Sequence, residues 1–234
     1  MARVLIATLA GTLSAVPLLL PTAAHAATVE ASWQMNEPAN ATTMLDSSGN
    51  GLNGAINQAG LDTGIVVDGA TGYRWAYKGP NSLPVAPERI INVADNARLD
   101  PMNDTYTLEI RFRTSRTFGN IVQKGQSATP GGQVKIQNPQ GRPSCLFKGP
   151  SGQVGVRAVT PLNNNVWHTL RCVKTSTNLT MYVDGVYVGR KTGTTGIINN
   201  NQPYSIGGKT NCDQVVTTCD YYTGDIDYIT ITRG

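Results

Sequence analysis

The sequence is poor in the residues that most hydrolases use for acid–base catalysis. Glutamate occurs at only four positions, and they are far apart: Glu30, Glu37, Glu88 and Glu109. Retaining glycoside hydrolysis needs two carboxyl groups about 5 Å apart, yet no Asp stands two positions before or after Glu109. The chain has two histidines, so a Ser-His-Asp mechanism in the mature protein would depend on His168 alone. This scarcity favours a protein without catalytic activity.

Signals for other common sites are also missing. A single histidine in the mature chain argues against a His-rich zinc or copper site. The segment Gly207-Gly208-Lys209 lacks the spacing of a phosphate-binding P-loop. The formal charge is +4, and the basic residues form no stripe, which excludes a typical nucleic-acid surface. Arg111 and Arg113 do share one face of a predicted strand, which a solvated sheet face explains.

Long apolar runs are absent beyond the N-terminus. Residues 1–26 have the pattern of a secretory signal peptide: Arg3 is basic, residues 4–20 are mostly apolar, and Ala24-His25-Ala26 fits a cleavage site. A membrane anchor is the alternative, although Gly11 and Pro17 interrupt the run that a span of about 20 residues requires. We therefore predict a secreted protein without a membrane partner, and we expect a monomer. The mature chain, residues 27–234, has the length of one β-sandwich domain.

Four cysteines are present, and all of them lie in the exported part. An even number in an oxidising compartment predicts two disulfides, for which three connectivities are possible. We favour Cys145–Cys172, which would tie one strand to a neighbouring meander, and Cys212–Cys219, which would close a short loop. A Cys-only metal site is the alternative, but the close Cys pairs of zinc sites are missing.

Hydrophobic residues alternate with polar ones over several short segments, and no helical period is sustained. In residues 106–113 the apolar side chains of Tyr106, Leu108, Ile110 and Phe112 alternate with polar ones, as in a half-buried strand. Residues 167–188 predict three antiparallel strands, with Asp184-Gly185 as the turn of a hairpin. Further short strands are expected at the ranges 29–35, 89–94, 121–122, 133–137, 144–148 and 154–159. Their close spacing favours a sandwich.

Three motifs carry a family resemblance. Trp167-His168 followed by Tyr182-Val-Asp-Gly, the loop 45–54, and the segment 222–231 stand in the same order as in laminin-G-like domains. The chain resembles this branch of the concanavalin A-like lectin and glucanase superfamily over residues 28–232. The resemblance implies an all-β, two-sheet antiparallel jelly-roll sandwich. It does not fix the function, because one fold hosts lectins, hydrolases and adhesion modules.

The resemblance also implies a structural calcium ion. It brings the loop containing Asp46, Asn50 and Asn53 close to the last strand, where Asp227 should share an inward face with Ile229 and Ile231. An inward carboxylate needs a partner, and Ca²⁺ accepts 6 to 8 oxygen ligands in irregular geometry. The alternative is that these side chains only cap backbone turns.

A row of aromatic residues is the candidate ligand site. Tyr73, Trp75 and Tyr77 alternate and would share one strand face, where flat rings suit the C–H face of a sugar. Core packing is the alternative. The sequence therefore predicts a secreted carbohydrate-binding, lectin-like module for extracellular carbohydrate. An extracellular glycoside hydrolase or polysaccharide lyase, and an adhesion or protein-interaction module, remain the alternatives.

Overall fold

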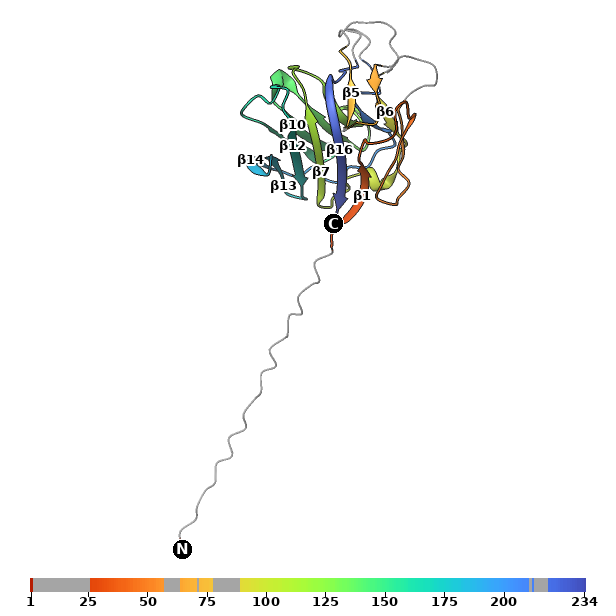
Figure 1. The fold of residues 1–234 in the computed structure, drawn as a ribbon. Coiled ribbons are helices and arrows are strands. Elements are labelled where there is room, and N and C mark those ends of the chain that lie inside the picture. The colour runs from red at the N-terminus through yellow and green to blue at the C-terminus, as the bar shows by residue number, and fades with distance from the viewer. Residues whose placement is uncertain (2–25, 57–63, 71, 78–88, 211, 213–218) are drawn as a thin grey trace.

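The computed structural model describes residues 1, 26–56, 64–70, 72–77, 89–210, 212 and 219–234. These residues form an all-β sandwich of two antiparallel sheets with eight strands each, as predicted (Figure 1). Two short 3₁₀ helices, η1 (Ala97–Leu99) and η2 (Pro139–Gly141), lie in connecting segments. None of the described residues belongs to a helix long and apolar enough to cross a lipid bilayer.

Sheet A contains the predicted meander at one end. Its strands follow one another in the order β14 (Val186–Thr192), β13 (Asn178–Val183), β12 (His168–Lys174), β7 (Tyr106–Arg113), β16 (Gly224–Arg233), β5 (Tyr73–Trp75) and β4 (Ile65–Val66). Strand β1 (Thr28–Trp33) also pairs with β16, so β16 lies inside the sheet. β5 pairs with the first residues of β16, and β1 pairs with its last residues. Both strands therefore lie on the side of β16 opposite to β7.

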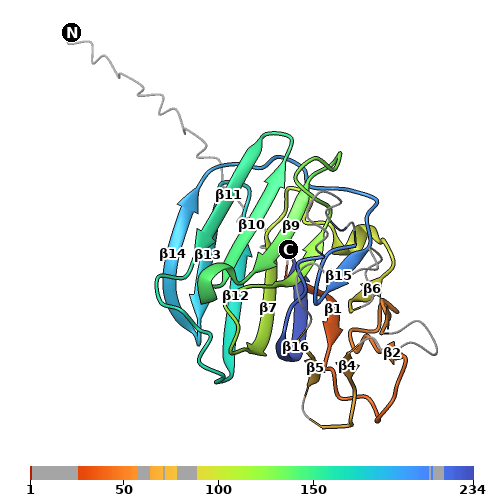
Figure 2. The same ribbon diagram turned by 90° about the horizontal axis from the view of Figure 1, so that it is seen from above.

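Sheet B covers the inner face of sheet A. Its order is β11 (Gly152–Arg157), β10 (Ser144–Gly149), β9 (Gln133–Gln137), β8 (Asn120–Lys124), β15 (Tyr204–Ile206), β6 (Ile91–Val93), β3 (Gly54–Ala55) and β2 (Thr43–Met44). The edge strands β14 and β11 lie at the same end of the sandwich, and β4 and β2 lie at the other end (Figure 2).

Alternation decides which side chains enter the core. In β7 the residues Tyr106, Leu108, Ile110 and Phe112 are fully buried, and the residues between them are partly exposed, as predicted. The hairpin between β13 and β14 is also confirmed, because Asp184 and Gly185 have φ angles of 49° and 77°. Such left-handed angles match the right-handed twist of the two strands.

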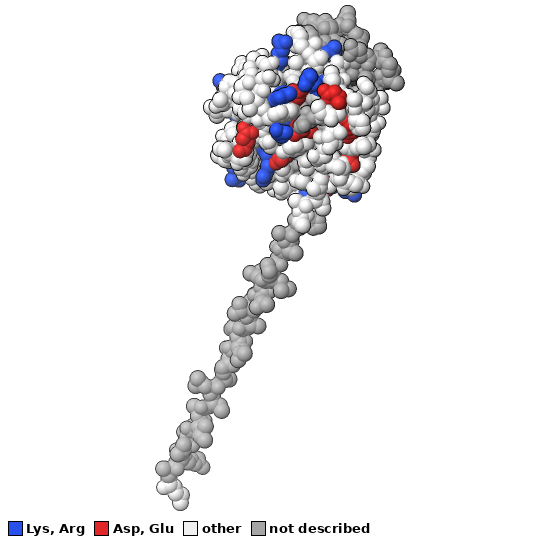
Figure 3. Space-filling view, viewed as in Figure 1, with Lys and Arg blue, Asp and Glu red and all other residues white. Residues whose placement is uncertain are grey.

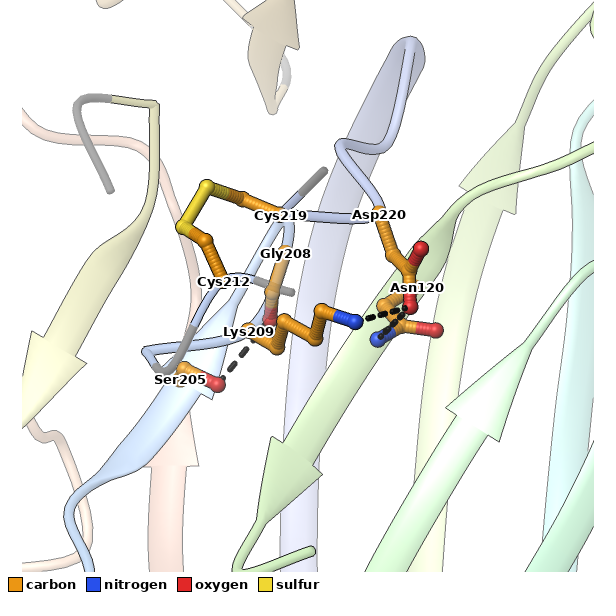
Figure 4. The surroundings of a disulfide bond; sticks show 7 residues. All are labelled: Asn120, Ser205, Gly208, Lys209, Cys212, Cys219 and Asp220. Atoms are coloured by element: carbon orange, nitrogen blue, oxygen red, sulfur yellow. Dashed lines mark hydrogen bonds and ion pairs between the residues drawn. A yellow bond between two sulfur atoms is a disulfide. The ribbon is translucent and has the colours of Figure 1, made fainter. Parts of the chain in front are cut away.

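Both predicted disulfides are confirmed. Cys145 of β10 and Cys172 of β12 are buried, and their bond joins sheet B to sheet A across the core, with the Cα atoms 6.2 Å apart. Cys212 and Cys219 form the second bond (Figure 4). Next to it, Lys209 Nζ lies 3.1 Å from Asp220 Oδ2 (Figure 4). An ion pair therefore supports the base of this small loop.

The predicted orientation of Asp227 is wrong. A β-bulge between Ile226 and Tyr228 leaves Asp227 as an extra residue opposite β7. The bulge shifts the alternation, so Ile226 and Ile229 are buried while Asp227 is partly exposed. Asp227 then meets Nη1 of Arg111 on the outer face. An extra residue of this kind reverses the face to which the preceding side chains of the strand point. A strict two-residue alternation does not predict such a reversal.

Candidate functional site

Side chains from five neighbouring strands form one row on the outer face of sheet A. The strand register pairs them in succession, from Tyr187 through Tyr182, Arg171 and Glu109 to Thr230. Directly paired residues of antiparallel strands project from the same face. The neighbours of these residues along each strand, such as Leu108, Leu170 and Met181, are fully buried. We call these five side chains the outer row.

A hollow of about 520 Å³ opens beside the outer row. Its lining residues are Glu109, Thr169, Arg171, Tyr182, Asp184 and Gly185. This volume lies within the range of roughly 300–1,000 Å³ that is usual for small-molecule sites. The lining combines an aromatic ring, two carboxylates and a guanidinium. Such a surface offers both a flat apolar face and charged hydrogen-bonding groups.

The aromatic part of the outer row is braced by contacts between its members. The rings of Tyr182 and Tyr187 meet edge to face, with their centroids 6.1 Å apart. The guanidinium carbon of Arg171 lies 5.2 Å from the centre of the Tyr182 ring. Edge-to-face and cation–π contacts of this kind fix ring orientation. Tyr187 is nevertheless 58% exposed, so one ring remains accessible.

Glu109 is held by a phenol from the neighbouring strand. The hydroxyl of Tyr228 donates a hydrogen bond to Glu109 Oε1 at 2.9 Å. Burial raises the pKa of Tyr228, and the hydrogen bond and negative charge of Glu109 raise it further. The phenol therefore stays protonated at neutral pH and acts as a donor. Glu109 accepts this hydrogen bond and lines the hollow.

Asp184 builds the rim of the hollow. Its Oδ1 accepts a hydrogen bond from the backbone N–H of Thr169 at 2.8 Å, and its Oδ2 lies 2.8 Å from Nδ1 of His168. The second ring nitrogen of His168 lies 3.0 Å from Oδ1 of Asn164. These contacts tie the β13–β14 turn to the start of β12. His168 is therefore held between Asp184 and Asn164 and supports this turn.

The predicted aromatic platform is wrong. Tyr73 and Trp75 are each 1% exposed and belong to the core, where the Trp75 ring packs edge to face against Tyr222. Only Tyr77 is exposed, at 57%, and it lies beneath the guanidinium of Arg116 at 4.1 Å. Tyr73 and Trp75 share one strand face, as predicted, but that face is buried against the opposite sheet. Core packing is the reading that holds for Tyr73 and Trp75.

The residues predicted to bind calcium do not fit that site in their present arrangement. Asp46 accepts four hydrogen bonds, from the backbone N–H groups of Ser32, Ser48 and Leu52 and from the Ser48 hydroxyl. A carboxylate has about four lone-pair sites, so both oxygens are occupied.

The amide side chains of the same loop bind backbone groups as well. Asn53 Oδ1 accepts a hydrogen bond from the Asp46 N–H at 2.8 Å, and Asn50 Nδ2 donates to the carbonyls of Val29 and Glu30. Asp227 is paired with Arg111. Among the described residues, no group of three or more His, Cys, Asp or Glu side chains could hold a metal ion. Calcium binding stays a prediction that this geometry does not support.

A second, apolar hollow lies at the sandwich end where β14 and β11 meet. It measures about 330 Å³ and is lined by Ala158, Val159, Thr160, Leu162, Val183, Val186 and Val188. Val159 and Val186 are exposed. This apolar groove is the surface that a protein-interaction module would use. It offers few polar groups for recognising a sugar hydroxyl.

Comparison with known proteins identifies the family. Residues 88–233, more than half of the chain, match a laminin G-like family described as the concanavalin A-like lectin/glucanases superfamily. The chain belongs to this superfamily. No curated protein sequence matches it. The superfamily fold and the two disulfides indicate an extracellular protein, because disulfides persist outside the reducing cytosol.

Several solved structures are similar to this chain. Domain 4 of an extracellular arabinanase from Geobacillus stearothermophilus, in complex with arabinotriose, has a TM-score of 0.61 and 17% identity, covering 89% of this chain and 93% of that one. The binding domain of Paraclostridial Mosquitocidal Protein 1 has a TM-score of 0.58 and 14% identity, covering 88% and 48%. Domains LG4-5 of the mouse laminin alpha1 chain have a TM-score of 0.48 and 16% identity, covering 68% and 46%. The chain thus spans about half the length of the latter two.

Proposed function

We propose that this protein is a secreted carbohydrate-binding domain whose ligand lies on the outer row of sheet A. The observation that carries the proposal is the hollow beside Tyr182, where an aromatic ring, Arg171 and Glu109 converge. Sugar rings present apolar C–H faces that stack on aromatic rings, and their hydroxyls pair with charged groups. The arabinotriose complex of the similar arabinanase domain supports a saccharide as ligand.

The charged hollow supports carbohydrate better than the apolar groove supports a protein partner. The hollow is the larger of the two, at about 520 Å³ against about 330 Å³. It also contains hydrogen-bonding groups that are already oriented by neighbouring strands, whereas the groove is lined almost entirely by aliphatic side chains. Oriented polar groups around an apolar surface are the usual basis of small-molecule recognition.

Hydrolysis is the alternative that the same hollow raises, because Glu109 and Asp184 both line it. Glycoside hydrolases use such pairs, one as acid and one as base or nucleophile. Both oxygens of Asp184, however, already bind the backbone of Thr169 and the ring of His168. These contacts favour a structural role for Asp184, and we propose binding without catalysis.

Binding to a neutral glycan array tests the proposal, with Tyr187→Ala and Tyr77→Ala as a matched pair. Tyr187 and Tyr77 are 58% and 57% exposed, so the two substitutions remove similar areas of exposed aromatic surface. We expect Tyr187→Ala to weaken binding about tenfold or more, since a stacked ring contributes on the order of 1.4 kcal/mol. Tyr77→Ala should bind like the wild type.

Two outcomes would contradict the proposal. Equal losses in the two variants would remove the outer row as the binding surface. Release of reducing sugar by the wild type that disappears in Glu109→Gln would show a hydrolase. Thermal melting of both tyrosine variants provides the control for folding.

A further inference from the structure

Three arginines gather at the end of the outer face where β5, β16 and β7 run side by side. The register pairs Arg74 with Asp225, and Asp225 with Arg113. Arg111 lies two residues before Arg113 in β7 and forms an ion pair with Asp227. We call Arg74, Arg111 and Arg113 the arginine cluster. Figure 3 shows basic and acidic side chains gathered on this face of the molecule.

Asp225 binds two of these arginines by their inner nitrogen. Nε of Arg74 donates to Asp225 Oδ1 at 3.0 Å, and Nε of Arg113 donates to Oδ2 at 2.5 Å. A guanidinium has five N–H donors in a fixed fork. In the described part of the chain, no oxygen accepts a hydrogen bond from the terminal Nη groups of either arginine. The carboxylate therefore fixes both side chains through Nε, and among the described residues it leaves their Nη groups available.

An aromatic ring holds the cluster from the other side. The guanidinium carbons of Arg111 and Arg113 lie 4.7 and 4.8 Å from the centre of the Trp167 ring. Stacking on a ring and pairing with a carboxylate restrict a long side chain that is otherwise mobile. The side chains of Arg74 and Arg113 remain 58% and 32% exposed. Oriented but accessible guanidiniums lose little entropy when they bind an anion.

The charges of the cluster leave room for one more anion. Within the cluster alone, three guanidiniums face two carboxylates, Asp225 and Asp227, which leaves one positive charge in excess; the adjoining hollow adds Arg171 and the carboxylates of Glu109 and Asp184. Arginine forks pair with planar or tetrahedral oxyanions through parallel N–H···O bonds. The cluster also adjoins the hollow, because Arg111 is the cross-strand partner of Thr169, which lines it. A saccharide in the hollow would extend towards these guanidiniums.

We propose that the arginine cluster binds a singly charged oxyanion on a saccharide chain, either the carboxylate of a uronate or a sulfate ester. This inference rests on the proposed carbohydrate-binding function and names the chemical class of the ligand: an acidic polysaccharide. The hollow would contact sugar rings and hydroxyls. The arginine cluster would supply the preference for acidic over neutral chains.

Paired probes test the inference with the full-length mature protein. Polygalacturonate is compared with its carboxyl-reduced neutral form, and dextran sulfate with dextran. We expect the acidic member of at least one pair to bind about tenfold more tightly, as charge-assisted hydrogen bonds imply. The difference should shrink as salt is raised, because exposed charges are screened. The pair that shows the preference identifies the oxyanion as carboxylate or sulfate.

Two arginine variants and one control separate a local site from general charge. Arg113→Gln and Arg74→Gln should each abolish most of the preference for acidic probes. Arg74→Gln keeps the ion pair between Asp225 and Arg113, so it can replace Arg113→Gln if that variant does not fold. Arg190→Gln removes the same charge from the edge strand β14, where Arg190 is exposed, and should keep the preference.

The outcomes distinguish this inference from the proposed function. Equal binding of acidic and neutral probes, with a loss in Tyr187→Ala, would overturn the arginine cluster as a site and leave the carbohydrate function intact. An acidic preference that Arg190→Gln reduces as much as Arg113→Gln would also overturn it. Absence of binding to every probe would overturn both proposals.

Discussion

At the residue scale, the clearest lesson concerns which face of a strand is buried. The alternation of Tyr73 and Trp75 with polar neighbours predicted a shared face, and they do share one. A period of two is the same for either face, so the pattern cannot say whether the rings meet water or the other sheet. Here the Trp75 ring meets Tyr222, and both rings belong to the core of the sandwich. Tyr77 lies just beyond the strand and is exposed.

Trp75→Ala should therefore act on stability and not on ligand binding alone. Removing a fully buried aromatic side chain leaves a cavity, and the free energy of unfolding should fall by about 3–5 kcal/mol. Tyr77→Ala, at an exposed position, should change it by less than about 0.5 kcal/mol. Urea unfolding of both variants measures the difference. A Trp75→Ala protein as stable as the wild type would contradict the burial seen here.

The lowered pKa of Asp46 should make the stability of the protein depend on pH. Burial raises the pKa of this carboxyl, but hydrogen bonds from Ser32, Ser48 and Leu52 outweigh it and hold the pKa below 3.8. Its contribution is therefore complete above the ordinary pKa and is lost as the pH falls through the lowered value. Between pH 6 and pH 3, Asp46→Asn should lose less unfolding free energy than the wild type does. Identical losses in urea titrations would contradict this role.

Chelation tests the calcium prediction separately from the role of Asp46. A bound ion stabilises the folded state by mass action, so chelator should lower the melting temperature and added calcium should restore it. The hydrogen bonds around Asp46 need no metal, and they would leave melting unaffected by either treatment. Elemental analysis of the purified protein decides between these two accounts. Melting that ignores both reagents, together with no detected metal, would dismiss the calcium site.

At the scale of strands, local patterns predicted the elements well. The faces of β7 and the hairpin turn at Asp184-Gly185 follow from the sequence, and the structure confirms the disulfide pairing favoured among three possibilities. The order of the strands in each sheet does not, because pairing between distant segments leaves no local periodicity. The outer row illustrates this. Alternation pointed Glu109 outwards, but only the register brings it beside Arg171 and Tyr182.

The site was missed for the same reason. Glu109, Arg171 and Tyr182 come from three strands, and only Tyr182 belongs to a short motif, Tyr182-Val-Asp-Gly. The bulge at Asp227 adds a second difficulty, because one extra residue turns a carboxylate from the core to the surface. A motif search finds chemistry that is contiguous in sequence. Chemistry assembled across a sheet becomes visible when the strand order is known.

The two disulfides should differ in their effect on stability. Cys145 and Cys172 are 27 residues apart and join the two sheets, whereas Cys212 and Cys219 are 7 residues apart. Closing the longer loop stabilises the folded state by about 3–4 kcal/mol through lost entropy of the unfolded chain, which is more than the shorter loop contributes. Cys172→Ala should therefore lower the melting temperature more than Cys219→Ala. The opposite order in a calorimetric scan would contradict this explanation.

At the scale of the whole molecule, the sandwich depends on its last strand. β16 pairs with β7 on one side and with β1 and β5 on the other (Figure 1). Its residues Ile226, Ile229 and Ile231 are completely buried. Without β16, β1 would lose its only partner strand among the described residues, and β7 and β5 would keep only β12 and β4. The core would also lose three large side chains.

A chain that lacks residues 224–234 should not melt cooperatively, because it cannot complete sheet A. Adding a synthetic peptide of residues 224–234 should restore a melting transition, since the peptide can pair with the open edges of β7 and β1. A peptide of the same composition in scrambled order serves as the control. Cooperative melting of the truncated chain alone would show that the sheet closes without β16.

The inner position of β16 also bears on how the protein is made. The strand that completes sheet A is synthesised after every strand it joins, and contacts so distant in sequence slow folding. Until β16 has been made, the nascent chain therefore cannot complete sheet A. Such a delay favours export of a polypeptide as an extended chain, because the chain can cross the membrane before it folds. The order of strands thus delays the completion of sheet A until β16 has been synthesised.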